Sequence, residues 1–161
     1  MACDASSILN AMQAHAAGTN DASVIDPEEL GRVVVDAVKS AMPQASWVGI
    51  YWLRRGELVL GPYEGPATEH DRIPIGTGVC GTAVQEDKDQ LIPDVREIDN
   101  YLACSADVRS ELVVLIRSHG QIIGQIDLDA NEVEAFSNDD FCVLRTVADG
   151  FGGLLAPQFP A

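Results

Sequence analysis

The residues with the clearest chemical potential are two cysteines and a group of acidic side chains. Cys80 lies inside the glycine-flanked run Gly76–Gly81, whereas Cys104 lies in a polar, turn-rich stretch. A structural cysteine is usually a buried small hydrophobe, so it would be less expected at Cys104. The acidic residues that follow are Glu111, Asp127 and Asp129. A thiol near several carboxylates indicates redox chemistry on a polar small molecule.

The reactivity of a cysteine belongs to its thiolate, whose pKa falls near helix N-termini and rises in apolar surroundings. We expect Cys80 at the first turn of a short helix, where backbone N–H groups would stabilise a thiolate. The alternative is that Cys80 is a buried small residue packed beneath a glycine turn. Cys3, in the N-terminal segment, and Cys142, beside Phe141 on the last predicted helix, are interpreted as non-catalytic.

The two aspartates alternate with apolar residues. Asp127 and Asp129 are separated by Leu128, so in a strand both acids point to the same face. An ordinary half-exposed strand gives the same pattern, and the sequence alone favours that interpretation. Glu111, at the start of the preceding strand, would face them across a hairpin. Acids gathered in this way suit either binding of a substrate ammonium group or donation of a proton.

Length and composition indicate one domain spanning residues 1–161, with residues 1–20 forming an N-terminal helix and a mobile terminus. The net charge of −15 and the absence of a basic stripe argue against a nucleic-acid partner. No apolar stretch approaches membrane-spanning length, so no membrane is expected. The first residues lack the pattern of a signal peptide, which predicts a cytoplasmic, reducing location with most cysteines as thiols. The acidity suits solubility or a salt-rich cytoplasm, and composition leaves both open.

The hydrophobic pattern predicts the order helix, helix, hairpin, long loop with a short helix, hairpin, helix. Helices are expected over 5–17, from the cap Asp26 to Pro43, over 79–85 and from the cap Ser137 onward. Hairpins are expected over 47–60 and 111–128, a loop over 61–78 with a possible short strand at 72–75, and a short edge strand at 90–93. This order defines an α+β domain with helices segregated around an antiparallel sheet.

A longer series of motifs resembles the free methionine-R-sulfoxide reductases, small stand-alone GAF-domain enzymes that reduce the free amino acid. The matching segments are Trp47–Tyr51, Leu60–Tyr63, Ile73–Ala83, Pro93–Val95, Ala103–Cys104, Ser110–Val113 and Gly124–Asp129. The resemblance implies a GAF fold with a central antiparallel sheet and helices mainly on one face. It also implies a homodimer, and neither an organic cofactor nor a metal.

By position in these motifs, Cys104 corresponds to the catalytic cysteine of the family. The resemblance further implies that Trp47 and Tyr51 wall the pocket, and that the three acids hold the substrate and assist at the sulfoxide. The thiolate would attack the sulfoxide sulfur and become a sulfenic acid. A second thiol would then form a disulfide, which a thioredoxin-type dithiol or a small thiol would reduce by exchange.

The sequence departs from the family at His70, where the usual partner cysteine for the disulfide is expected. Four recycling routes stay open: Cys80 as the resolving thiol, which we favour; Cys3; direct attack by an external thiol; or no turnover. His70 is either a solvated loop histidine or a group that polarises Cys104 or stabilises its thiolate. A metal site using His70, Cys80 and Cys104 lacks the close-spaced ligand pairs of structural zinc.

Because His70 replaces the usual resolving cysteine, a second function is also considered. Without its usual resolving cysteine, the chain would be a non-catalytic GAF module that binds a small amino compound or senses redox state. The fold alone does not separate the two functions.

Overall fold

A six-stranded antiparallel sheet forms the centre of the computed structural model, which describes residues 4–19, 25–103 and 105–159. The strands are β1 (Trp47–Arg54), β2 (Glu57–Glu64), β3 (Arg72–Pro74), β4 (Gln90–Ile92), β5 (Ser110–Ser118) and β6 (Gln121–Ala130). Their order across the sheet is β3-β2-β1-β6-β5-β4, with each neighbouring pair antiparallel. Two predicted hairpins, β1–β2 and β5–β6, therefore meet at the β1–β6 pair.

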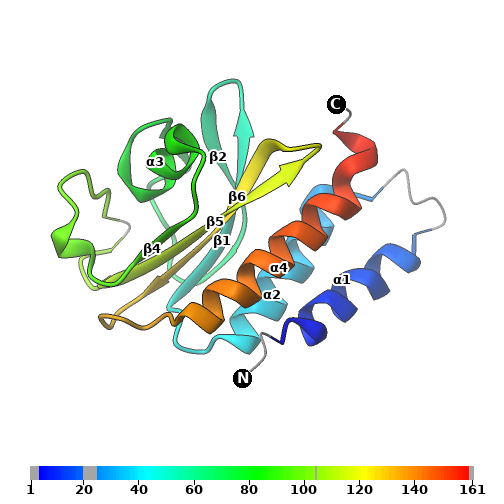
Figure 1. Ribbon diagram of the computed structural model, residues 1–161, viewed down its shortest axis with the longest axis horizontal. Helices are drawn as coiled ribbons and strands as arrows, with labels where there is room; N and C mark the ends of the chain where they lie inside the picture. The colour runs from blue at the N-terminus through cyan, green and yellow to red at the C-terminus, as the bar shows by residue number, and fades with distance from the viewer. Residues whose placement is uncertain (1–3, 20–24, 104, 160–161) are drawn as a thin grey trace.

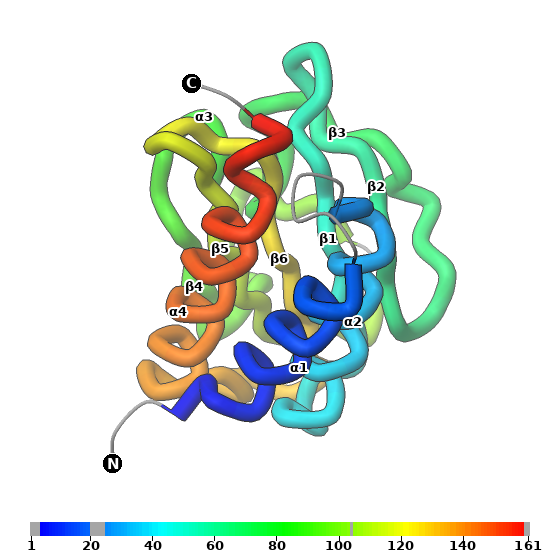
Figure 2. The backbone as a smooth tube through the Cα atoms, turned by 90° about the vertical axis from the view of Figure 1, so that its right-hand side faces the viewer, coloured from blue at the N-terminus to red at the C-terminus, as the bar shows by residue number. Residues whose placement is uncertain are grey.

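The long helices cover one face of this sheet and a short helix lies on the other (Figures 1 and 2). Among the described residues the α-helices are α1 (Ser6–Ala17), α2 (Pro27–Ala41), α3 (Gly78–Glu86) and α4 (Asn138–Leu155). Short 3₁₀ turns occur at Val95–Glu97 and Ala156–Gln158. Helices α2 and α4 contact the strands directly, and α1 packs against both of them. None of the helices within the described ranges is long and apolar enough to cross a membrane.

The predicted helix caps are present. The Asp26 carboxylate accepts a hydrogen bond of 2.8 Å from the backbone N–H of Glu28, and Pro27 occupies the first position of α2. At α4, Ser137 and Asp140 form a reciprocal capping box. Local sequence signals therefore set where these two helices begin.

Alternation along the central strands creates two cores. On the helix side, Val48, Ile50 and Trp52 of β1 belong to a large apolar cluster with α1, α2 and α4. On the opposite side, Trp47 and Tyr51 belong to a smaller cluster that includes α3. Both faces of β1, β5 and β6 are therefore buried, which a polar-apolar alternation does not reveal.

The expectation of a loop from residue 61 is wrong at its start, because β2 continues to Glu64. Residues Tyr63 and Glu64 pair with Gly49 and Val48 of β1, beyond a register shift at which β2 carries the extra residue. Strand β3 pairs with β2 only over 57–59, so Pro62 has no second neighbouring strand to which it would need to donate. The proline therefore does not end the strand.

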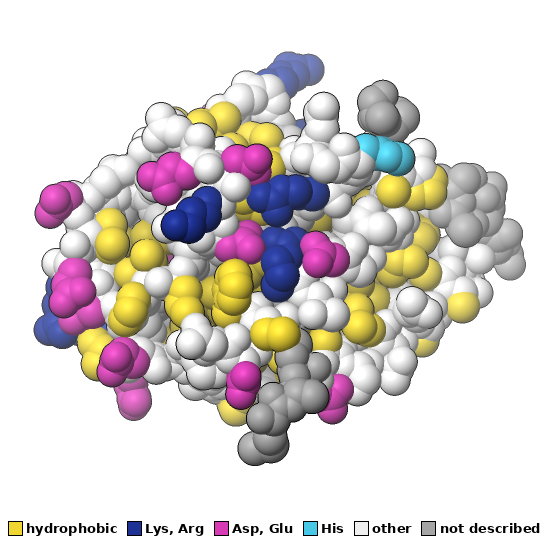
Figure 3. Space-filling view, in the orientation of Figure 1, with side chains coloured by type: hydrophobic (Ala, Val, Ile, Leu, Met, Phe, Trp, Pro, Cys, Tyr) yellow, Lys and Arg dark blue, Asp and Glu magenta, His cyan; other side chains and the backbone are white. Residues whose placement is uncertain are grey.

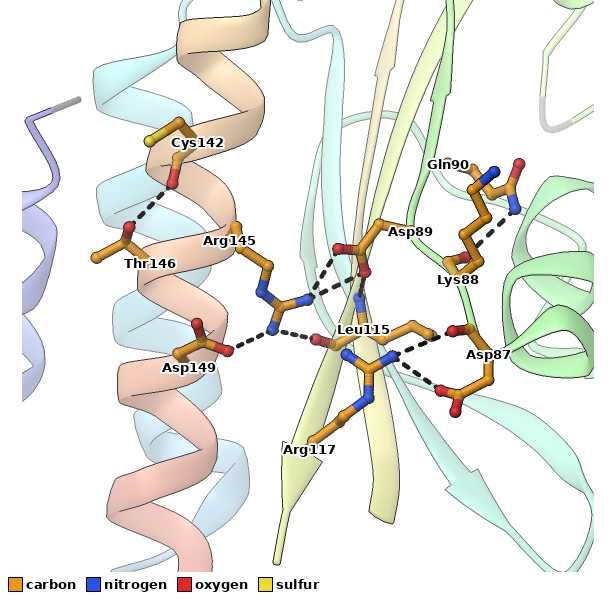
Figure 4. A network of polar contacts seen from close by, with 10 residues as sticks. All are labelled: Asp87, Lys88, Asp89, Gln90, Leu115, Arg117, Cys142, Arg145, Thr146 and Asp149. Carbon is orange, nitrogen blue, oxygen red and sulfur yellow. Dashed lines mark hydrogen bonds and ion pairs between the residues drawn. The ribbon is translucent and has the colours of Figure 1, made fainter. Parts of the chain in front are cut away.

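A polar network joins α4 to the edge of β5 (Figure 4). The Arg145 guanidinium contacts both carboxylate oxygens of Asp89 at 3.0 Å and donates to the carbonyl of Leu115 at 2.7 Å. Asp89 in turn accepts a bond of 2.8 Å from the N–H of Leu115. These side chains satisfy the backbone of β5 just past the last residue paired with β4, where an open edge would otherwise remain. Figure 3 shows the molecule in the orientation of Figure 1, and the basic side chains near the middle of the visible surface lie among acidic ones.

Close packing of α4 on β5 depends on Gly152. A Cβ atom built at this position would lie 2.0 Å from the carbonyl oxygen of Arg117, whereas one at Gly153 would meet nothing within 4 Å. We predict that Gly152→Ala lowers the free energy of unfolding by about 1–3 kcal/mol, because the helix must move away from the strand. The matched control, Gly153→Ala, should be neutral or stabilising by up to about 1 kcal/mol. Equal urea midpoints for the two variants would contradict this account of the packing.

Candidate functional site

The predicted acidic side chains lie together on the face of the sheet that α3 covers. Glu111 of β5 pairs directly with Asp129 of β6, so their side chains point to the same face, and Asp127 is two residues away on that face. The exposed fractions of Glu111, Asp127 and Asp129 are only 4%, 0% and 1%. The prediction that Glu111 faces Asp127 and Asp129 across the hairpin is confirmed. The half-exposed interpretation of this strand is wrong, because α3 and the loops bury the face.

Cys80 joins this group from α3. Its thiol is 5% exposed and donates to Glu111 Oε1 at 3.7 Å. One ligand atom from each of Cys80, Glu111 and Asp127 lies within 4.8 Å of the others. The structure therefore brings one sequence-predicted cysteine into contact with two of the predicted carboxylates.

The prediction that the start of a helix stabilises a Cys80 thiolate is wrong. Cys80 does lie in the first turn of α3, where backbone N–H groups favour an anion. However, burial and then the charges of Asp127, Glu111 and Asp129 raise the pKa of the Cys80 thiol well above its ordinary value. The carboxylates and the loss of solvent outweigh the helix terminus, so Cys80 is held as a thiol.

Burial also changes the protonation of the acids. It is the main cause that raises the pKa of Glu111 well above its usual range, with the charge of Asp127 next. Burial raises the pKa of Asp127 to about 6, and that of Asp129 well above its ordinary value. The cluster therefore keeps protons near neutral pH that exposed carboxyl groups would have lost.

The two aspartates lack hydrogen-bond partners among the described residues as well as solvent. All four oxygens of Asp127 and Asp129 are buried without a hydrogen bond from the described residues. Buried acceptors of this kind are rare in native proteins and carry a large desolvation penalty. The arrangement suits a ligand that brings hydrogen-bond donors and positive charge, such as an ammonium group.

Two aromatic side chains lie on the same face beside the acids. Trp47 pairs with Asp129 and Tyr51 with Gln125, and the centroids of the two rings are 6.2 Å apart. The indole lies over Gly49, where a Cβ atom would come within 2.1 Å of the ring. The predicted aromatic wall residues are thus next to the carboxylates, and Gly49 leaves the space for the indole.

His70 lies near the segment that leads into Cys104. Its Nε2 is 2.9 Å from the carbonyl oxygen of Ala103, and its own carbonyl accepts a bond of 2.8 Å from the Tyr51 hydroxyl. Cys104 itself and Cys3 lie outside the described residues. The structure therefore connects His70 with the neighbour of the predicted nucleophile and with the aromatic wall.

Two depressions reach different members of this cluster. One is an open cleft with about 430 Å³ of empty space, and it extends between Trp47, Asp129 and the 105–108 segment. The other is a narrow pocket lined by Cys80, Glu111 and Leu102, among others. Leu102 is two residues from Cys104, so the chain around the predicted nucleophile borders the site.

Gln125 also lies at the site, although the sequence patterns did not predict it as a site residue. It is fully buried, and neither its amide nitrogen nor its amide oxygen has a hydrogen-bond partner among the described residues. The available signal was its position, because Gln125 precedes Asp127 by two residues and so shares its face of β6. An amide placed there extends the polar character of the site beyond the three acids.

We predict that Gln125→Leu stabilises the protein by about 1–3 kcal/mol, because it removes two unsatisfied buried polar groups at similar volume. Urea unfolding of the variant and the wild type would measure the change. The matched control is Gln121→Leu at the exposed start of the same strand, which should change stability by less than about 0.5 kcal/mol. A loss of stability in Gln125→Leu would show that the amide is satisfied in solution.

Comparison with known proteins agrees with this architecture. The GAF domain model matches residues 24–156, which is most of the chain. The chain therefore belongs to the GAF domains. Within them it belongs to the free methionine-R-sulfoxide reductases, an enzyme family, as its motifs predict.

Three bacterial enzymes are among the relatives that support this assignment. The free methionine-R-sulfoxide reductase of Escherichia coli is 40% identical over 111 residues, which are 69% of this chain and 67% of that protein. The Staphylococcus aureus enzyme in complex with its substrate is 30% identical, with a TM-score of 0.82 over 97% of this chain and 98% of that chain. The enzyme from Neisseria meningitidis, also solved with its substrate, is 28% identical, with a TM-score of 0.84 over 99% of this chain and 96% of that chain.

Proposed function

We propose that this chain reduces free methionine-R-sulfoxide to methionine with Cys104 as the nucleophile. The observation that carries the proposal is the buried group of Glu111, Asp127 and Asp129 beside two aromatic rings. The unpartnered carboxylates of Asp127 and Asp129 suit the ammonium group of a free amino acid, and Trp47 and Tyr51 suit its apolar methylthio end. Membership of the reductase family supports the same substrate.

The reaction needs a thiolate and a proton. The Cys104 thiolate attacks the sulfoxide sulfur, and the oxygen passes to the cysteine sulfur with uptake of one proton. The substrate is reduced to a thioether, and Cys104 is oxidised to a sulfenic acid. The raised pKa values of the buried acids, about 6 for Asp127, favour a carboxyl group that holds this proton near neutral pH.

Recycling is proposed to use Cys80 as the resolving thiol. The Cys80 thiolate would attack the sulfenic acid sulfur and form a disulfide with Cys104, and the displaced hydroxide would take up one proton and leave as water. The narrow pocket shared by Cys80 and Leu102 supports proximity of the two segments. The raised pKa of Cys80 makes this step slow at neutral pH and faster as the pH rises. A thioredoxin-type dithiol or a small thiol would then reduce the disulfide.

His70 is proposed to act on Cys104 indirectly. Its Nε2 contact with the Ala103 carbonyl would hold the backbone beside the nucleophile, and a protonated imidazole there would favour the thiolate. We further expect the enzyme to be a cytoplasmic homodimer of this one domain. Light scattering at several concentrations would test the oligomeric state.

The second candidate is a GAF module that binds a small amino compound without turnover. The presence of His70 where the family usually has a cysteine favours it, because the resolving step then depends on Cys80, whose raised pKa keeps the thiol protonated. Binding of free methionine sulfoxide without any product would support this candidate.

The deciding experiment supplies the reduced protein with free methionine-R-sulfoxide and either dithiothreitol or a thioredoxin system. Methionine should form, and the S epimer should stay unconverted as the control. Mass spectrometry of the substrate-treated protein, without reductant, should show a bridge between Cys80 and Cys104. No methionine under either reductant would overturn the enzyme assignment, and a bridge from Cys3 to Cys104 would overturn the recycling route.

A further inference from the structure

Three potential metal ligands meet where α3 packs on β5 and β6. The Cys80 thiol, the Glu111 carboxylate and the Asp127 carboxylate come from separate elements, and one ligand atom from each lies within 4.8 Å of the others. All three residues are buried. A thiol with two carboxylates is a donor set that suits a borderline-soft divalent cation.

The spacing matches a particular coordination geometry. Zinc bonds of about 2.3 Å to sulfur and about 2.0 Å to oxygen at tetrahedral angles place the sulfur and an oxygen about 3.5 Å apart. The distance from Cys80 Sγ to Glu111 Oε1 is 3.7 Å. This pair fits zinc coordination, and the Asp127 oxygen, which lies within 4.8 Å of both atoms, would complete the set by moving closer to them.

A second observation favours binding of a cation at this position. Both carboxylate oxygens of Asp127 are buried and have no hydrogen-bond partner among the described residues, and the same holds for Asp129 beside it. A dication at this position would satisfy Asp127 directly and lower the repulsion from Asp129. The thiol proton of Cys80 would leave to solvent as the metal–sulfur bond forms.

We infer that Cys80, Glu111 and Asp127 form a zinc-binding site. Calcium and magnesium prefer all-oxygen sets, so the thiol selects against them. The inference concerns binding and does not depend on turnover. Its consequence for activity rests on the proposed function: zinc would occupy the oxygens assigned to the substrate ammonium group and engage the resolving thiol.

The test uses reduced full-length protein in which Cys3, Cys104 and Cys142 are replaced by serine, so that Cys80 is the sole thiol. Equilibrium dialysis against Zn²⁺ in 0.15 M salt with millimolar Mg²⁺ should find one zinc ion per chain. Addition of Cd²⁺ should produce the ultraviolet charge-transfer band of a cadmium thiolate. Far-ultraviolet circular dichroism would confirm that each variant is folded.

The further replacement Cys80→Ser should abolish the band and lower the zinc affinity by about 10²-fold. Glu111→Gln, which keeps the thiol and the side-chain shape, should also lower the affinity by at least tenfold. In the natural sequence, Cys142→Ser is the matched control, because this exposed cysteine belongs to α4 on the opposite face of the sheet, and its replacement should leave zinc binding by Cys80 unchanged. Absence of stoichiometric zinc in the folded single-thiol protein, or equal affinity after Cys80→Ser, would overturn the inference.

Discussion

Replacement of Cys104 by serine is expected to lower the reduction of free methionine-R-sulfoxide by at least about 10³-fold. A serine hydroxyl is a far weaker nucleophile than a thiolate, and serine forms no sulfenic acid that a thiol could recycle. The measurement is methionine formation in the presence of excess dithiothreitol, where the resolving thiol is not required. The result would support Cys104 as the attacking atom in every recycling route.

The matched control for this prediction is Cys142→Ser. Cys142 is an exposed cysteine on α4, a helix on the sheet face opposite the candidate site. Its replacement should leave the rate within about twofold of the natural sequence, since surface substitutions rarely disturb a remote site. Activity that survives in Cys104→Ser would mean that another thiol is the nucleophile, and Cys80→Ser would then be the next variant to assay.

Asp127→Asn is expected to produce the second large effect, a loss of kcat/KM of about 10²–10³-fold. The asparagine keeps the shape but removes both a negative charge for the ammonium group and a carboxyl that can hold a proton. Steady-state kinetics would divide the loss between KM and kcat. Asp36→Asn on α2 is the control, because its exposed carboxylate lies on the opposite side of the sheet.

The same substitution should raise stability. Because burial raises the pKa of Asp127 to about 6, ionisation of this group disfavours the folded state. The folded state holds its proton to higher pH than the unfolded chain, so this contribution to stability is complete below about pH 4 and is lost as the pH rises through about 6. Removal of the charge should therefore stabilise the protein by up to about 3 kcal/mol above pH 7.

Urea unfolding at pH 4, 6 and 8 would measure this linkage. The stability difference between Asp127→Asn and the natural sequence should be small at pH 4 and largest at pH 8, while Asp36→Asn should show no such trend. A variant that is less active and less stable at pH 8 would contradict the account, because the carboxylate would then be satisfied in the folded protein.

Much of the framework was predictable because its signals are local. The caps at Asp26 and Ser137 are hydrogen bonds between residues two or three apart, and the hairpins depend on turns between adjacent strands. The extension of β2 through Pro62 was not predictable in the same way. It depends on where β3 ends beside β2, and that is a property of two segments brought together by the fold.

The candidate site likewise has features that neighbouring residues predict and features that only the packing of distant segments sets. The alternation around Leu128 predicts that Asp127 and Asp129 share a face, and the hairpin predicts that Glu111 joins them. The same alternation does not predict which element covers that face. Burial by α3 decides that the acids are dry, that their pKa values rise, and that Cys80 is a thiol among carboxylates.

The sequence by itself determined the family and the residue types available for chemistry, because motifs and strand periodicity are carried by neighbouring positions. Only the tertiary structure decided that Cys80, Glu111 and Asp127 meet within 4.8 Å, and that Gln125 lies unpartnered beside them. The physical reason is that desolvation and charge repulsion depend on every group packed around a site. At this site Cys80 comes from α3, which is distant along the chain from the β5–β6 hairpin and adjacent to it only in the fold.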